Sequence, residues 1–324
     1  MHRETGLRTF ADEVVGDDLG RNERLERIHA SIDWDRIGGI VEGLHSSGEG
    51  RKAYPPLLMM KAMLLQHLHD LGDPKLEERL SNDLSWRRFV GLGLGDGTPD
   101  HSTISRFRNL IVERGLMRRV FESVNEQLDE NGLVLRRGTV VDATLVEARA
   151  SRPRRRRGED GAASRGPADP DATWGRRTFG YKGHLAIDHG SWLVRGALLT
   201  PAHVNDTLMC DALIQGDEEV LYADAAYETA RRGGMLARMG IGNAVMHRPN
   251  KHHPVLSPEQ RARNAEISKR RMPAEGVFGY FKRTLGYRRA RYAGLARGET
   301  ELLLKSTVYN IVRALKLADA PARA

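Results

Sequence analysis

Two aspartates of this chain directly follow short runs of apolar and β-branched residues. Asp142 comes after residues 139–141, and Asp224 comes after residues 220–223. Such runs predict buried strands, so each carboxylate would lie at the carboxyl end of a strand. A charge there is costly unless a cation or hydrogen bonds compensate it, and strand ends are where α/β folds hold ligands. The two aspartates are therefore candidates for a metal site.

A third acid, Glu275, lies in the most basic part of the chain. Residues 261–291 hold 10 basic and 2 acidic side chains. Glu275 is either a salt-bridge partner of these cations or the third ligand of a divalent-metal site whose phosphate substrate needs them. Three carboxylates suit two Mg²⁺ ions, because hard cations prefer oxygen ligands. Two ions about 3.5–4 Å apart would activate the attacking water or 3′-hydroxyl and stabilise the leaving oxygen.

The charge of the whole chain is unevenly placed. The 324 residues carry 51 Lys and Arg against 43 Asp and Glu, a net charge of +8. Residues 1–100 hold 13 basic and 18 acidic side chains, so the basic surplus belongs to the remainder. A focused positive field indicates a polyanionic partner.

The composition excludes several classes of protein. The single cysteine, Cys210, rules out an intrachain disulfide and a cysteine-rich zinc module. No apolar run approaches the roughly 20 residues of a membrane span, and residues 1–15 lack the apolar core of a signal peptide. We therefore expect a reduced, cytoplasmic protein that makes no membrane contact.

Residues 1–132 are predicted to form an all-helical N-terminal domain. Apolar residues recur there at helical spacing, and the helices are expected near residues 21–30, 56–71, 76–92, 102–115 and 117–132. Residues 72–74, Gly-Asp-Pro, break the chain between two of them. Asp100 or Ser102 can cap the helix that follows the Gly-rich residues 91–100.

The pattern changes to an α/β domain over residues 133–324. Strands are predicted within residues 133–148, 181–188, 192–200, 219–224 and 243–249, and helices near 206–215, 229–240 and from Pro258 onward. The turn at residues 188–191 predicts a hairpin. Residues 150–178 have almost no large apolar side chain, so a basic, mobile, solvated insertion is expected there. The fold class is α/β behind a helical domain.

Seven segments carry a further signal: PPLLMMKAMLLQHLHDLGD, RRFVGLGLGDGTPDHSTISRFR, GTVVDATLVEARAS, FGYKGHLAID, TPAHVNDT, YADAAYE and RMPAEGVFGYFKRTLGYRRARYAGL. Together they resemble a bacterial insertion-sequence transposase of the DDE class, in the large family named after insertion sequence five. The resemblance covers roughly residues 50–315. It implies a ribonuclease H-like mixed-sheet catalytic core behind the helical domain. In that fold the first and fourth strands are neighbours, which would bring Asp142 and Asp224 together.

The resemblance also implies the roles of individual residues. It places the catalytic, metal-binding acids on Asp142, Asp224 and Glu275, with two Mg²⁺ ions, or Mn²⁺ as a substitute, in the active site. The signature Tyr-x2-Arg-x3-Glu-x6-Lys of related families fits Arg271, Glu275 and Lys282, but its tyrosine position is occupied by Ser268. We expect Arg271 and Lys282 to neutralise phosphate near the scissile bond.

The implied function is DNA transposition. The protein would bind the terminal inverted repeats of its element, cleave DNA there by two-metal hydrolysis and join the 3′-hydroxyl ends to target DNA. A homodimer on double-stranded DNA, associated with the nucleoid, is expected by the same resemblance. A metal-dependent nuclease that no longer joins strands, or an inactive DNA-binding relative, remains open as an alternative.

Further DNA contacts are predicted from basic side chains outside the signature. The helices near residues 74–90 and 102–115 have the layout of a helix-turn-helix, with Arg106 and Arg108 at the start of the second helix. A helical bundle that docks or dimerises is the alternative. Arg283 adds to the basic window, and the basic run 152–157 is either a phosphate contact or a solvated loop.

Four further side chains, and the position of one proline, have roles that depend on the three-dimensional structure. If Pro273 lay in the first turn of its helix, Glu275 would be near the positive end of the helix dipole. Asp188 is expected to serve its turn through backbone hydrogen bonds. Lys182 and His184 either contact DNA or the metal shell or have ordinary strand-surface roles, and Tyr227 either packs or stacks on a base.

Overall fold

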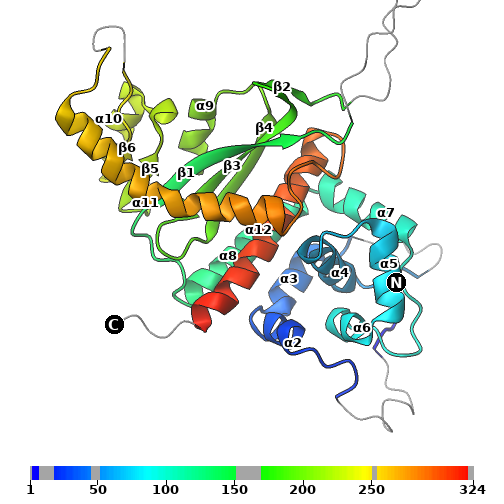
Figure 1. The fold of residues 1–324 in the computed structure, drawn as a ribbon. Helices are drawn as coiled ribbons and strands as arrows, with labels where there is room; N and C mark the ends of the chain where they lie inside the picture. The colour runs from blue at the N-terminus through cyan, green and yellow to red at the C-terminus, as the bar shows by residue number, and fades with distance from the viewer. Residues whose placement is uncertain (1, 7–17, 45–51, 151–168, 250–253, 320–324) are drawn as a thin grey trace, which may run out of the picture. The chain divides into compact units, whose positions relative to one another are not determined.

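The computed structural model describes residues 2–6, 18–44, 52–150, 169–249 and 254–319. The chain forms two compact units, which are described separately (Figure 1). The helical unit comprises residues 1–131 and 303–324, and the sheet unit comprises residues 132–302. The basic run 152–157 lies outside the described residues. In the described part of the chain, no helix is long and apolar enough to cross a membrane.

The helical unit is built around one helix that is buried on nearly every side. This helix is α4 (Pro56–Leu68), in which even Lys61, Gln66 and His67 are buried, as expected for the centre of a bundle. The other helices of the unit are α2 (Glu23–Ala30), α3 (Trp34–Val41), α5 (Asp73–Asn82), α6 (Leu84–Val90), α7 (His101–Glu113) and α8 (Leu116–Glu130).

The last helix, α12 (Leu295–Ala318), contributes its residues from 303 onward to the helical unit. Val308 and Ile311 line the same small apolar pocket as Trp34 and Leu65. The sequence pattern places residues 303–324 with the catalytic domain, because a helical pattern alone does not show which core the apolar side of a helix joins. The functional roles given to the two domains stay predictions.

The helix expected over residues 76–92 is two helices in the structure. Asp83 ends α5 in an extended backbone conformation, and its carboxylate accepts the backbone N–H groups of Ser85 and Trp86 to begin α6. An aspartate commonly caps a helix in this way. Asp100 caps α7, as expected, by accepting the N–H of Thr103 at 2.6 Å.

The sheet unit contains a six-stranded mixed sheet. Its strands are β1 (Thr139–Glu147), β2 (Thr173–Gly175), β3 (Thr178–Asp188), β4 (Val194–Pro201), β5 (Val220–Ala223) and β6 (Gly242–Val245). Their order is β2-β3-β1-β5-β6, and β4 also pairs with β3. The pairs β1–β3 and β3–β4 are antiparallel, whereas β1–β5 and β5–β6 are parallel.

Short helices and one long helix complete the sheet unit. They are α9 (Asp206–Cys210), the 3₁₀ helices η1 (Asp211–Leu213) and η2 (Ala225–Tyr227), α10 (Ala230–Met239) and α11 (Pro258–Arg283). Helix α11 contacts β1 and β5, and α10 contacts β6. The predicted fold class, a ribonuclease H-like α/β core preceded by an all-helical region, is confirmed.

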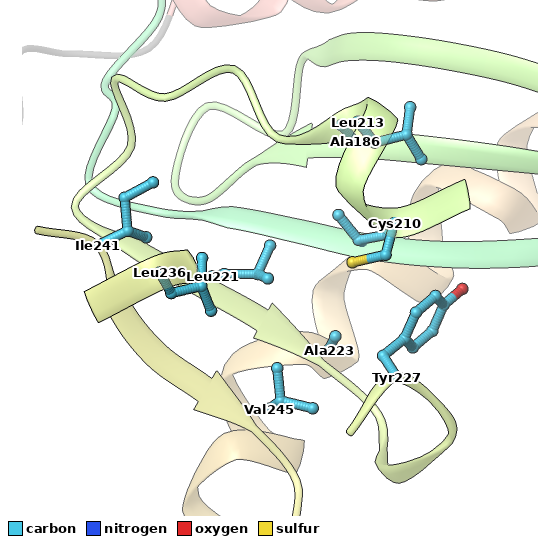
Figure 2. Close-up of a cluster of buried hydrophobic side chains, with 10 residues drawn as sticks. Ala186, Cys210, Leu213, Leu221, Ala223, Tyr227, Leu236, Ile241 and Val245 are labelled. Carbon is cyan, nitrogen blue, oxygen red and sulfur yellow. The ribbon is translucent and has the colours of Figure 1, made fainter. Parts of the chain in front are cut away.

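An apolar core fills the sheet unit between these elements. It joins Val141 of β1, Ala223 of β5 and Cys210 of α9 with side chains of α10 and β6, and it includes the ring of Tyr227 (Figure 2). Val141 and Ala223 directly precede Asp142 and Asp224 in the chain. The core therefore anchors the backbone immediately before each of the two acids.

Candidate active site

Asp142 and Asp224 lie at equivalent positions of neighbouring parallel strands. Strands β1 and β5 pair through Thr139 with Leu221 and through Val140 with Tyr222. Each aspartate comes two residues after this last paired position. Strand β5 ends at Ala223, directly before Asp224, but β1 runs on to Glu147, so Asp142 lies inside its strand and not at the carboxyl end where the sequence pattern predicted it. The parallel register still brings the two aspartates to neighbouring positions, as the family resemblance implied.

The carboxylate of Asp142 is only partly compensated by its surroundings. Its Oδ1 accepts the N–H of Ala143 at 2.8 Å, and its Oδ2 accepts from the Arg271 guanidinium at 3.1 Å. Burial raises the pKa of Asp142, the carboxylates of Asp224 and Asp206 raise it further, and Arg271 opposes them. The net direction is upward and comes first from burial, so the charged form of Asp142 is only partly stabilised by Arg271 and the N–H of Ala143.

Asp224 has a structural task as well as a place beside Asp142. Its Oδ1 accepts the N–H of Ala226 at 2.7 Å, which caps η2. This bond orients the carboxylate at the end of β5 and fixes the start of the loop that follows it. The loop therefore holds Asp224 in place at the end of β5.

The third predicted acid, Glu275, lies on the exposed part of α11. Residues 271, 275 and 282 are four and seven positions apart, so Arg271, Glu275 and Lys282 share one face of the helix. Arg271 on that face binds Asp142. Glu275 lies about one turn farther along, and among the described residues its carboxylate makes no hydrogen bond or ion pair. The structure thus unites Asp142, Asp224 and Arg271, with Glu275 nearby on the same helix.

The expectation about Pro273 is wrong. Helix α11 begins at Pro258, where Ser257 caps it, and Pro273 lies inside the helix. The dipole effect fades beyond the first turn. The helix N-terminus therefore does not favour the charged form of Glu275, and the basic residues before Pro273 extend the helix rather than precede it.

The donor set at this edge suits a hard cation. The carboxylates are oxygen donors, and Asp142 is largely buried with a single guanidinium as its charged partner. As the side chains are placed, no three His, Cys, Asp or Glu residues of the described ranges are grouped closely enough to hold a metal ion. Arg271 takes Asp142 Oδ2, so a cation would compete with this guanidinium. The chemistry of the residues fits a divalent cation, which would require Arg271 to move.

A fourth carboxylate at this edge was missed by the sequence analysis. Asp206 begins α9, which contacts β1, and its Oδ1 lies 2.6 Å from Nζ of Lys182 on β3. Lys182 also donates to the carbonyl of Val204 at 2.8 Å. The segment TPAHVNDT contains Asp206, but nothing in it indicates an approach to Asp142, which depends on how α9 returns to β1.

A buried arginine ties together the two segments that carry Asp206 and Asp224. Arg232 of α10 is 2% exposed and donates to the carbonyls of Thr207 and Tyr227 and to Asp211 Oδ1. Thr207 Oγ1 also donates to the carbonyl of Ala226 at 2.5 Å. These bonds fix the spacing of the two acid-bearing segments.

The predicted DNA-binding side chains fall into two groups. Arg106 and Arg283 are exposed, and Lys282 is half-buried, with a pKa lowered first by burial and then by Arg288. Arg108 is different, because its side chain is 5% exposed and its guanidinium binds both oxygens of Asp73 at 2.7 Å. The prediction that Arg108 contacts DNA is therefore corrected: its position on α7 faces the helical core.

The other open interpretations are also resolved by burial and contacts. Asp188 accepts the N–H groups of Leu135 and Arg136 and the hydroxyl of Ser191, which confirms its role at the turn. His184 is fully buried against Thr200, and burial lowers its pKa to about 4, so it cannot meet DNA. Tyr227 is 1% exposed and packs rather than stacking on a base.

Comparison with known protein families agrees with this arrangement. Residues 135–311 match a family described as a transposase DDE domain, which spans more than half of the chain. Residues 13–110 match a second family, described as a transposase domain. The first match encloses Asp142, Asp224 and Glu275, and the second encloses α7 up to Leu110.

Proposed function

Because the chain belongs to the DDE transposase family, we propose that it moves an insertion sequence by cutting DNA at the element's ends and joining them to a target. DNA transposition and the use of divalent cations are general to this family. Recognition of terminal inverted repeats, membership of the group named after insertion sequence five, a DNA-bound homodimer and a place at the cytoplasmic nucleoid are finer parts of the proposal.

The meeting of Asp142 and Asp224 on adjacent parallel strands is the observation that supports the proposal most. In the proposal, Asp142, Asp224 and Glu275 hold two divalent cations. Bound there, such cations supply Lewis-acid stabilisation at the scissile phosphate and activate the attacking water or 3′-hydroxyl. The protein itself contributes carboxylates and cations and needs no covalent nucleophile.

Arg271 has two partners in this proposal. In the structure it neutralises Asp142. When cations occupy the carboxylates, the guanidinium is released and is placed to bind a phosphate near the scissile bond, for which its planar fork is suited. Lys282 and Arg283, about three turns along α11 from Arg271, would bind phosphates farther along the same strand.

Binding of the element's ends is assigned to the helical unit. Arg106 is exposed one turn into α7, and its guanidinium is held against its own helix by Ser102 and Thr103. The helix start therefore presents a cation to a DNA groove or backbone. Arg108 is not part of this surface.

The decisive experiment replaces one acid at a time by its amide, which removes the charge and keeps the size of the side chain. Asp142→Asn and Glu275→Gln should each abolish cleavage of DNA that carries the element's ends in Mg²⁺ or Mn²⁺, while binding of those ends in Ca²⁺ persists. Glu266→Gln is a matched control, because Glu266 is an exposed glutamate of α11 that pairs with Arg270.

Three outcomes would contradict the proposal. Full cleavage activity in either variant would show that the substituted acid is not part of the active site. Supplying wild-type protein with precut ends and target DNA tests joining separately, because only a transposase makes the joined product. Cleavage without joining would instead assign a nuclease, and binding without cleavage would assign an inactive relative.

A further inference from the structure

The hydroxyl of Tyr227 is an unpartnered polar group in the interior of the sheet unit. Tyr227 lies on η2, is 1% exposed, and its Oη has no hydrogen-bond partner among the described residues. Its ring packs beside Cys210 and Ala223, and Figure 2 shows the hydroxyl pointing away from the labelled apolar side chains. A buried donor without an acceptor costs free energy, so its position requires an explanation.

The chain around Tyr227 places this hydroxyl beside the candidate active site. Tyr227 packs in one core with Val141, Ala223 and Cys210. The first two of these residues directly precede Asp142 and Asp224, and Cys210 ends the helix that Asp206 begins. In agreement, the pKa of Tyr227 is raised first by burial and then by the carboxylates of Asp142, Asp206 and Asp224. The ring of Tyr227 therefore packs against the residues that directly precede Asp142 and Asp224.

The backbone of Tyr227 is held, so its ring cannot leave this position freely. Its N–H donates to the carbonyl of Asp224 at 3.1 Å, and its carbonyl accepts from the buried Arg232. The neighbouring carbonyl of Ala226 accepts from Thr207. The donor is thus preorganised rather than left over from a loose loop.

The nearby carboxylates already have other partners. Asp206 is neutralised by Lys182 at 2.6 Å, and Asp142 by Arg271 at 3.1 Å. Asp224 accepts the N–H of Ala226 at 2.7 Å, and no acceptor among the described residues takes the hydroxyl of Tyr227, so an acceptor from outside the chain can bind there. Magnesium and manganese ions keep several water molecules when carboxylates bind them, and such water is an oxygen acceptor of the right size.

We propose that the Tyr227 hydroxyl is a positioning group of the divalent-cation site, where it donates a hydrogen bond to a water molecule that the cation carries. This inference rests on the proposed function, because it takes Asp142 and Asp224 as ligands of that cation. Tyr227 acts through the water and not on DNA. It is a site residue that the three-acid signature does not include.

The test measures cation binding without DNA and without activity. Mn²⁺ is titrated into the full-length protein by calorimetry, and thermal unfolding is followed with and without Mn²⁺. Tyr227→Phe removes only the hydroxyl. It should weaken Mn²⁺ binding by about tenfold or more, as loss of a hydrogen bond around a metal site does. Without metal its Tm should equal or exceed that of the wild type, because an unsatisfied donor is gone.

Control variants separate this inference from the proposed function. Tyr287→Phe changes another fully buried tyrosine of the sheet unit, surrounded by Glu299, Glu301 and Tyr181, and should leave Mn²⁺ binding unchanged. Asp142→Asn and Asp224→Asn should abolish binding. If they do not, the proposed site itself is wrong.

Two results would overturn the role of Tyr227 alone. One is wild-type Mn²⁺ affinity in Tyr227→Phe while the aspartate variants lose binding. The other is a metal-free Tm several degrees below the wild type, which would show that the hydroxyl has a structural partner.

Discussion

Each unit of the chain contains an arginine–aspartate pair joining two elements, and the two pairs are built differently. In the helical unit, Arg108 meets both oxygens of Asp73 at 2.7 Å, and Gln66 donates a further bond to Asp73 Oδ1 at 2.7 Å. In the sheet unit, Arg271 donates one bond of 3.1 Å to Asp142. The Nε atom of Arg271 is buried and has no hydrogen-bond partner in the described ranges.

This difference indicates that the Arg108–Asp73 pair stabilises the fold, whereas in the Arg271–Asp142 pair a ligand can replace one partner. The Arg108–Asp73 pair is bidentate and nearly enclosed, so its geometry matches the cost of burying two charges. The Arg271–Asp142 pair is single and lies among additional carboxylates that raise the pKa of Asp142. An incompletely satisfied pair beside a sheet edge is the arrangement expected where a ligand replaces one partner.

The largest predicted effect concerns the enclosed pair. Arg108→Met should lower the free energy of unfolding by about 3 kcal/mol, because Asp73, whose side chain is only 19% exposed, is left without its main partner. Urea unfolding measures this change. Arg106→Met, two positions away on the exposed side of α7, is the control and should change stability by about 0.5 kcal/mol or less. If both variants changed stability equally, the burial of Arg108 would not make it more important for the fold than the exposed Arg106.

The Arg271–Asp142 pair should show the opposite result: a large effect on DNA cleavage and a small effect on stability. Arg271→Met is expected to reduce the rate of DNA cleavage by about 100- to 1000-fold, the usual loss when one preorganised charge donor is removed from a phosphate site. The free energy of unfolding of Arg271→Met should fall by less than that of Arg108→Met, because water can replace the single hydrogen bond from Arg271 to Asp142. Cleavage rates and urea unfolding of the same preparations provide the comparison. Large destabilisation with unchanged cleavage would make Arg271 a structural residue.

The smallest predicted effect concerns the cap of α7 and depends on pH. Hydrogen bonds from Ser102 and Thr103 lower the pKa of Asp100 from 3.8 to about 2. A lowered folded pKa stabilises the protein above the ordinary pKa, and this contribution is lost as the pH falls through the folded value. Asp100→Asn keeps the capping oxygen, so stability at pH 7 should change by about 0.5 kcal/mol or less.

The variant should therefore differ from the wild type mainly in acid. Between pH 4 and 2, urea unfolding of the wild type should show a steeper loss of stability than Asp100→Asn. Parallel curves in this range would show that the carboxylate charge adds nothing to the cap.

Local sequence patterns predicted most of the helices and strands, whereas the contacts between distant segments could not be predicted from them. The strands before Asp142 and Asp224 were predictable because short β-branched runs are specific, and the family resemblance supplied the order that makes them neighbours. Helix α3 was not predicted, and the break at Asp83 was not, because an aspartate within an amphipathic pattern is compatible with both a cap and an exposed helical residue.

The side-chain roles were harder to predict than the elements. Arg108 and Arg106 are two residues apart, so they point to different sides of α7, but periodicity alone did not show which side meets the core. Asp206 and Tyr227 lie in the segments TPAHVNDT and YADAAYE, but the local pattern does not show that they approach Asp142. Their relation to Asp142 depends on Arg232 and Thr207 tying separate segments together, which is a contact between residues about 20 positions apart.

The proline inside α11 has a mechanical consequence. Pro273 has no N–H group, so the carbonyl of Lys269 lacks its usual backbone partner, and a helix bends most readily where such a bond is absent. This compliant point lies between Arg271 and Glu275. Ile267 before it and Phe281 after it are buried. Bending at this point would change the separation of Arg271 and Glu275 while Ile267 and Phe281 stay packed on either side of it.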